Sequence, residues 1–202
     1  MRTHPVFARV WDSVVRLGGR PEQRHRNRLV DGVRGRVLEV GAGTGLNLGR
    51  YSPGAEVVAL EPEPTMTRKA SARARAAPVP VRMVRGVAEA LPFSDRTFDT
   101  VVACYVLCSV SDPAKAIDEL RRVLRAGGEI RVYEHVRSAH SGWALVQDLV
   151  TPVWRRVGCN CHPNRDTAAA LRAAGFEVEV HRFSFGLPAP VRPHILGVAR
   201  PA

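Results

Sequence analysis

Features that mark several other classes of protein are scarce in this sequence of 202 residues. Four cysteines are too few for a disulfide framework in a chain of this length, so we expect reduced thiols. No apolar run approaches the ~18 residues of a transmembrane helix. Residues 1–10 carry charges and a proline rather than the apolar centre of a secretory signal. These absences favour a cytoplasmic location, and the ordinary balance of 45% hydrophobic and 24% charged residues excludes a disordered chain.

Lysine is almost absent, because arginine supplies 28 of the 30 cationic residues behind the net charge of +11. Residues 1–36 hold nine arginines against three acidic residues, which is +6 of that total. Such a segment could make peripheral contact with an anionic membrane surface, although charge runs are more often solvated faces. No zinc-finger, helix-turn-helix or base-stacking pattern accompanies the charge, so we expect no nucleic-acid partner.

Short apolar runs alternate with amphipathic segments in the middle of the chain. The predicted strands are 36–40, 56–60, 79–85, 98–104 and 129–134, and the predicted helices between them are 64–76 and 112–124. Continuous apolar strands that alternate with helices imply a parallel sheet covered on both faces.

The two ends of the chain add further elements. Helical spacing predicts helices over 6–17 and 21–29, then over 143–157 and 167–174, and alternation predicts strands over 176–183 and 195–200. The predicted fold class is α/β, a doubly wound, Rossmann-like, seven-stranded and mostly parallel sheet. Residues 1–34 would form an N-terminal helical lid on a domain spanning 35–202.

A glycine-rich turn, Gly41-Ala-Gly43-Thr-Gly45, follows the first strand of the predicted sheet. Glycines there let the backbone approach a ligand closely, and the carboxyl ends of strands are where open α/β sheets bind ligands. Glu61 ends the second strand, where a carboxylate can accept hydrogen bonds from both hydroxyls of a ribose. A nicotinamide-dinucleotide site would need G-x-G-x-x-G, but Leu46 occupies its last position.

The spacing G-x-G-x-G, with Glu39 two residues before it, resembles the first motif of class I S-adenosylmethionine-dependent methyltransferases. The resemblance continues through Gly86–Phe93, Phe98-Asp99 and Arg122–Gly128, and so covers residues 35–136. It implies an enzyme with S-adenosyl-L-methionine as cofactor. The cofactor contacts it implies are Glu39, Gly41, Ala42, Gly43, Thr44, Gly45, Asn47, Glu61, Pro62, Met66, Val87, Ala88, Glu89, Cys104 and Leu107.

One departure concerns the adenine. Many relatives carry Asp where Val87 stands, and that Asp contacts the adenine amino group. Glu89 or backbone groups near Ala88 would have to replace it.

The chain also resembles one branch of the family, the alkyl thiol methyltransferases of animals and their bacterial relatives. Val106–Val110, Glu134–Val136, Gly158–Asn160 and Arg192–Ile195 carry this likeness. It implies a small lipophilic acceptor, with a thiol as first choice. Animal members begin with an apolar anchor, whereas residues 1–34 here are basic, and they usually carry Asp at the position of Glu61.

His135 ends the fifth predicted strand and could take the thiol proton or orient the acceptor. Glu134 beside it could polarise His135 or cap the strand, and we take both as the candidate catalytic residues. A structural histidine is the competing interpretation of His135. Trp143, Trp154 and Phe185 could line an apolar acceptor pocket or belong to the core.

The cysteines are more simply interpreted as small buried side chains than as ligands. Cys159-Asn-Cys161-His162 invites a zinc interpretation, but no partner pair lies elsewhere in the sequence. We therefore expect no metal.

Other functions share these motifs. A quinone-ring C-methyltransferase or a phospholipid N-methyltransferase has nearly the same core, and a basic N-terminal face suits an interfacial substrate. A non-enzymatic S-adenosylmethionine-binding regulatory protein is the alternative outside enzymes, and turnover separates it from them.

Overall fold

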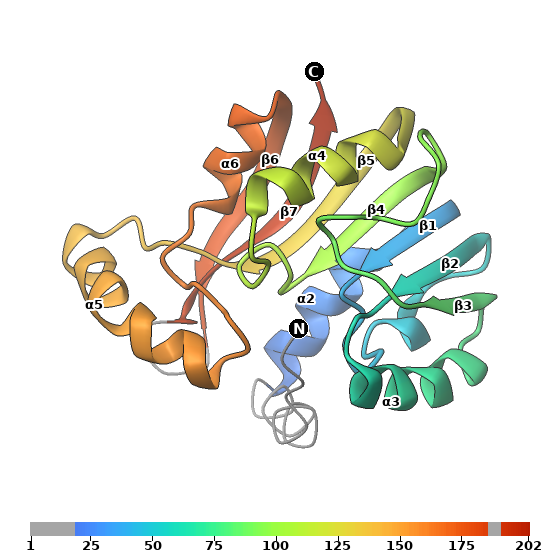
Figure 1. Ribbon diagram of the computed structural model, residues 1–202, viewed down its shortest axis with the longest axis horizontal. Coiled ribbons are helices and arrows are strands. Elements are labelled where there is room, and N and C mark those ends of the chain that lie inside the picture. Colours follow the sequence, from blue (N-terminus) through green and yellow to red (C-terminus); the bar gives the residue numbers. More distant parts are fainter. Residues whose placement is uncertain (1–18, 186–190) are drawn as a thin grey trace.

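The computed structural model describes residues 19–185 and 191–202, and within them seven strands form one sheet (Figure 1). The order across the sheet is β3-β2-β1-β4-β5-β7-β6. The strands are β1 (Gly35–Val40), β2 (Ala55–Leu60), β3 (Val81–Val84), β4 (Phe98–Cys104), β5 (Leu124–His135), β6 (Phe176–Ser184) and β7 (Pro193–Pro201). Neighbours are parallel except for β7, which is antiparallel to β5 and β6. The predicted fold class is confirmed.

The helices begin where the sequence carries starting signals. They are α2 (Gly19–Val30), α3 (Pro64–Arg75), α4 (Pro113–Val123), α5 (Ser141–Val157) and α6 (Thr167–Ala173), with a 3₁₀ turn η1 (Leu48–Arg50). Carboxylates of Glu63, Asp112 and Asp166 cap α3, α4 and α6 by accepting a hydrogen bond from a backbone N–H of the first turn. The helix predicted over 6–17 lies outside the described residues.

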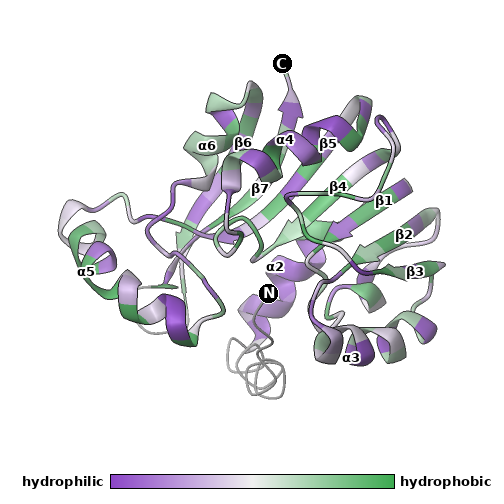
Figure 2. Cartoon of the chain, in the orientation of Figure 1, coloured by the Kyte–Doolittle hydropathy of each residue, from purple (hydrophilic) through white to green (hydrophobic). Residues whose placement is uncertain are grey.

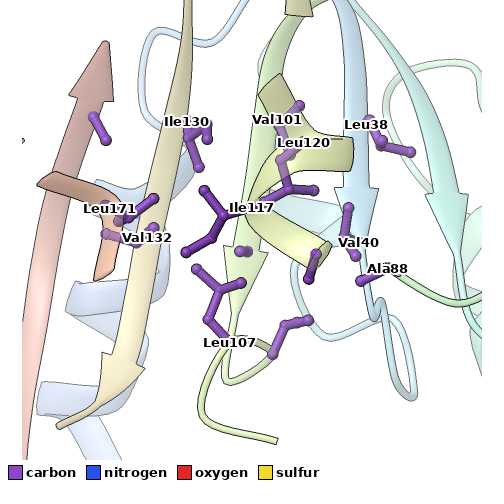
Figure 3. Close-up of a cluster of buried hydrophobic side chains, with 14 of the residues drawn as sticks. Leu38, Val40, Ala88, Val101, Leu107, Ile117, Leu120, Ile130, Val132 and Leu171 are labelled. Carbon is purple, nitrogen blue, oxygen red and sulfur yellow. The ribbon is translucent and has the colours of Figure 1, made fainter. Parts of the chain in front are cut away.

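Side chains of each strand alternate between two apolar clusters, one on each face of the sheet. Leu38, Val101 and Ile130 lie on the face that α4 and α6 cover, together with Ile117 and Leu171 (Figure 3). The opposite face buries residues such as Val37, Val102 and Tyr133 against α2 and η1. Burial on both faces explains why the strands read as continuous apolar runs.

The fifth strand is longer than predicted. Its first residue, Leu124, already pairs with Phe98, and the pairing resumes at Glu129 opposite Thr100. Residues 125–128 are therefore looped out, and Gly127 adopts a φ of +75° there. The predicted turn thus lies within the strand rather than before it.

The described part of the predicted lid packs on the sheet. Leu29, Val30 and Val33 are buried in the cluster that α2 shares with β1 and β2. Residues 19–34 thus contribute to the core of the domain, while a lid function for 1–34 stays a prediction.

Helix α5 stands apart from the sheet (Figure 1), and hydrophobic residues recur along it (Figure 2). Its exposed large apolar side chains are Trp143, Leu145, Leu149, Val153 and Val157, which form an apolar stripe toward solvent. Within the described residues, none of the helices has the length and apolarity to cross a bilayer.

Candidate functional site

The strand order reverses between β1 and β4, and the glycine turn after β1 lies at this switch point. Gly41, Gly43 and Gly45 all have φ between +57° and +80°. A Cβ on Gly41 would lie 2.7 Å from Cγ2 of Val106, in the loop after β4. The turn therefore requires glycine for both its conformation and its close packing.

A small cavity of about 30 Å³ opens at this turn. It is lined by Arg26, Glu39, Gly41, Ala42, Gly43, Thr44, Leu46, Asn47 and Cys104. Seven of these nine residues are predicted cofactor contacts, so the structure brings together most of the set drawn from the turn. The cavity is far smaller than the 300 Å³ or more of a typical ligand pocket. It corresponds to one end of a larger ligand.

Glu39 is buried at the base of the cavity and holds the turn. Its carboxylate accepts hydrogen bonds from Asn47 Nδ2 at 3.0 Å and from the Tyr51 hydroxyl at 2.8 Å. Burial raises the pKa of Glu39 to about 7, although these two hydrogen bonds act in the opposite direction.

Arg26 of α2 also lines the cavity, and the sequence analysis did not single it out. Its guanidinium pairs with Glu22 at 2.6 Å and donates to Asn47 Oδ1 at 2.9 Å. Glu22 accepts in turn from the hydroxyls of Tyr133 at 2.6 Å and Tyr105 at 3.2 Å. Arg26 is one of nine arginines in residues 1–36, and no motif around it distinguishes it from the others.

Glu61 directly follows β2, and the residue is 5% exposed. One oxygen accepts from the Gly43 N–H at 2.8 Å and the other from the Glu63 N–H at 2.9 Å. Each carboxylate oxygen has two acceptor sites, so each keeps one for a ligand hydroxyl. Burial raises the pKa of Glu61, with these backbone hydrogen bonds opposing the shift.

Other predicted cofactor contacts follow the carboxyl ends of β2 and β3. Met66 Sδ lies 3.7 Å from the position of a Cβ on Gly43, and Pro62 directly follows Glu61. Ala88 belongs to the core, next to the bridge between Val87 and Ala90.

Two predicted contacts have other partners. One oxygen of Glu89 accepts from the Ser111 N–H at 2.8 Å, which ties the loop after β3 to the loop after β4. Leu107 is 1% exposed, and its side chain lies in the core cluster (Figure 3).

Glu134 anchors the loop that follows β4. It is fully buried, and its carboxylate accepts from the N–H groups of Val106, Leu107 and Cys108 at 2.8, 2.9 and 3.2 Å. Burial raises its pKa, and the three hydrogen bonds oppose that shift. These contacts make Glu134 a positioning residue, and no contact between its carboxylate and the His135 ring is among them.

His135 lies beside two cysteines from different loops. Its Nδ1 is 3.6 Å from Cys161 Sγ and 3.9 Å from Cys108 Sγ, and the two sulfurs are 3.8 Å apart. All three side chains are buried. The hydrogen bond with Cys108 lowers the pKa of Cys161, and the contact with His135 lowers it further, although burial opposes both. The hydrogen bond with Cys161, together with burial, raises the pKa of Cys108.

Aromatic rings surround His135 on its other side. It stacks on Tyr105 with ring centroids 4.4 Å apart and lies 4.7 Å from His194. The rings of Phe183 and Phe185 pack on His194 in turn. Of the predicted acceptor-pocket residues, Phe185 joins this group, whereas Trp143 is half-exposed on α5. His194 is buried, and burial lowers its pKa to about 3.

This sheet order, with a glycine turn at the switch point and an acid at the end of β2, defines the class of protein. The chain belongs to the class I S-adenosylmethionine-dependent methyltransferases. Residues 38–132 match the methyltransferase domain family. A SAM-dependent methyltransferase from Aquifex aeolicus has the same fold, with a TM-score of 0.66 at 17% identity over 98% of both chains.

Two curated relatives are more similar in sequence. Thiol S-methyltransferase TMT1B from Homo sapiens is 37% identical over 169 residues, which cover 81% of this chain and 69% of that protein. Phosphatidylethanolamine N-methyltransferase from Cereibacter sphaeroides is 40% identical over 103 residues, which cover 50% of this chain and 51% of that protein.

The cofactor is S-adenosyl-L-methionine, and the residues present fit it. The cavity at the glycine turn combines the carboxylate of Glu39 with the guanidinium of Arg26, which suits the ammonium and carboxylate of a methionine moiety. Glu61 offers acceptors to a ribose at the next strand.

Proposed function

We propose that this protein transfers the methyl group of S-adenosylmethionine to a small lipophilic thiol. The observation that carries the proposal is the 37% identity with a thiol S-methyltransferase over 81% of the chain. A match of that extent necessarily includes residues 39–164, and therefore Cys108, His135 and Cys161. The match with the phospholipid enzyme covers only half of the chain, which is little more than the common cofactor-binding core.

Thiol methylation requires little covalent chemistry from the protein. The cofactor supplies a methyl group already activated by its sulfonium. A bond forms between the acceptor sulfur and that methyl carbon while the carbon–sulfonium bond breaks, which yields a thioether and S-adenosylhomocysteine. The thiol must first lose its proton, because the thiolate is the nucleophile. Residues of this chain must therefore bind the acceptor, orient it and favour the thiolate.

His135 is the residue that we propose for the last task. It lies at the carboxyl end of β5, adjacent through Tyr105 to the strand that lines the cofactor cavity. The rings of Tyr105, His194 and Phe183 give this side of the site an apolar character that suits a lipophilic acceptor. We expect Glu134 to act indirectly, by holding the loop that carries Cys108.

The test is a comparison of acceptors with labelled cofactor. An alkyl thiol should be methylated faster than the alcohol and amine of the same chain and faster than a quinol. The rate should rise with pH toward the thiol pKa, and His135→Ala should move that rise to higher pH and lower the rate by about 10²–10⁴-fold. Methylation of the quinol or the amine without the thiol would replace this proposal with one of the alternative acceptors.

The basic N-terminal segment leads to a secondary proposal of peripheral contact with anionic membranes. It is supported by the charge of residues 1–36 and by the exposed apolar stripe of α5. Sedimentation with anionic vesicles should be strong at low salt and weaken as salt rises. Equal binding to neutral vesicles would contradict an electrostatic contribution. A cytoplasmic location also stays a prediction.

A further inference from the structure

The distances between the side-chain sulfur and nitrogen atoms of Cys108, His135 and Cys161 are close to those between ligands of one zinc ion. A tetrahedral zinc ion with Zn–S distances of about 2.3 Å and Zn–N distances of about 2.0 Å separates its ligands by about 3.8 Å between sulfurs and about 3.5 Å between sulfur and nitrogen. The observed separations are 3.8 Å between the sulfurs and 3.6 and 3.9 Å from the sulfurs to Nδ1. The three separations are thus close to those on one face of a zinc ligand tetrahedron.

The backbone around the cluster is fixed on both sides. Glu134 accepts hydrogen bonds from the N–H groups of residues 106–108, and the Cys108 carbonyl accepts from the His162 N–H at 2.7 Å. Asn160 Nδ2 donates to the Ser109 carbonyl at 2.7 Å, which joins the loop after α5 to the loop after β4. Such support holds ligands in place before an ion binds, and it reduces the entropy lost on binding.

The turn before Cys161 is conformationally costly. Cys159 and Asn160 are consecutive residues with φ of +51° and +62°, a region that non-glycine side chains rarely adopt. This turn directs Cys161 to Cys108 and His135, so the strained segment lies at the cluster itself.

We propose that Cys108, His135 and Cys161 bind a thiophilic divalent cation, zinc in the first instance, whose fourth position takes the sulfur of the acceptor thiol. Two cysteines and one histidine are a ligand set that leaves a zinc ion one open position for a substrate. A thiol that binds the ion releases its proton to solvent and stays a thiolate, because the metal stabilises the deprotonated form. His135 then favours the thiolate as a ligand of the ion rather than by accepting the proton. The part of the proposal that concerns the acceptor rests on the proposed function.

The first experiment measures metal content. The full-length protein, purified under reducing conditions without chelators, should contain about one zinc per chain by plasma mass spectrometry. Cys108→Ser and Cys161→Ser should each lower that content at least tenfold. Cys159→Ser is the matched control and should retain it, because Cys159 is not part of the cluster. Binding of S-adenosylhomocysteine by each variant shows that it has folded.

The second experiment replaces zinc by cobalt(II) and records the absorption spectrum. An alkyl thiol should alter the cobalt–thiolate bands, whereas the corresponding alcohol should not. The same titration on Cys161→Ser should give no thiol-dependent change.

The outcomes separate the two proposals. The metal site is overturned if the reduced protein does not bind added zinc. It is also overturned if the intact mass shows a Cys108–Cys161 disulfide in protein that is active on thiols. Either result leaves the proposed function intact. Zinc retained equally by Cys161→Ser also overturns the site. A zinc-bound protein that methylates a quinol and not a thiol overturns the proposed function and, with it, the role of the fourth position.

Discussion

The two halves of the sheet build their functional edges in different ways. In the cofactor half, β1 to β4, a turn of five residues supplies much of the cavity lining, and its partner Glu61 follows on the next strand. In the half that we propose for the acceptor, β5 to β7, the central cluster joins His135, at the end of β5, to Cys108 and Cys161 from the loops after β4 and α5. A local motif therefore identifies the cofactor, whereas the acceptor side depends on how distant segments meet.

The largest effect is expected where the two halves join. Glu134→Ala leaves three buried N–H groups without their acceptor, so the free energy of unfolding should fall by on the order of 3–5 kcal/mol. Chemical denaturation measures this loss. Glu134→Gln keeps one acceptor oxygen and should lose less. Equal stability of wild type and Glu134→Ala would mean that the loop does not depend on this carboxylate.

A second variant tests the cofactor half alone. Glu61→Ala should weaken binding of S-adenosylhomocysteine by about 10–100-fold, because hydrogen bonds to a charged group contribute roughly 1.5–3 kcal/mol. Glu56→Ala, at the exposed opposite end of the same strand, is the matched control and should bind normally. Calorimetry checks both. If NAD bound more tightly than S-adenosylhomocysteine, the assignment of the cofactor would be wrong.

The halves should also differ in how pH changes stability. The pKa of Glu39 is raised from 4.5 to about 7, so the folded state holds the extra proton and the contribution of Glu39 to stability falls as pH rises through this window. The pKa of His194 is lowered from 6.5 to about 3, so its contribution rises with pH between those values. Glu39→Gln and His194→Gln should change the slope of unfolding free energy against pH in opposite directions, which amounts to on the order of 3 kcal/mol across the Glu39 window and about 5 kcal/mol across the His194 window. Slopes that change in the same direction would contradict one of these assignments.

The smallest effect on stability is expected on α5. Leu149 is 71% exposed, so Leu149→Gln should change the free energy of unfolding by less than about 0.5 kcal/mol. Leu120→Ala, on the buried face of α4, should cost about 2–5 kcal/mol and is the contrasting control. Thermal denaturation compares them. A large loss in Leu149→Gln would show that the stripe is covered in solution.

The sequence was sufficient for the fold and for most of the lining of the cavity at the glycine turn, because both depend on local patterns. Strand and helix periods and the capping residues predicted every described helix and strand to within a few residues, apart from the start of β5. Seven of the contacts that the family resemblance implied line the cavity, and six of them lie in or beside the glycine turn. Arg26 was missed because its place depends on how α2 packs on the sheet.

The acceptor side could be predicted only in part. Successive side chains of a strand point to opposite faces, so the neighbours Glu134 and His135 diverge, and the roles of the two differ accordingly. The pattern around Cys159 and His162 lacked a partner pair in sequence, but the fold supplies Cys108 and His135 as partners of Cys161 instead. A contact between residues 53 positions apart has no signature in spacing.

The position of β7 has a consequence for the order in which the protein can assemble during synthesis. It is the last strand of the sequence, yet it lies between β5 and β6 and pairs with both. Until residues 193–201 have left the ribosome, β5 has an open edge and β6 has no partner. The strands of the cofactor half pair with one another without them. A nascent chain can thus form its cofactor pocket before β7 pairs with β5 and brings His194 next to His135.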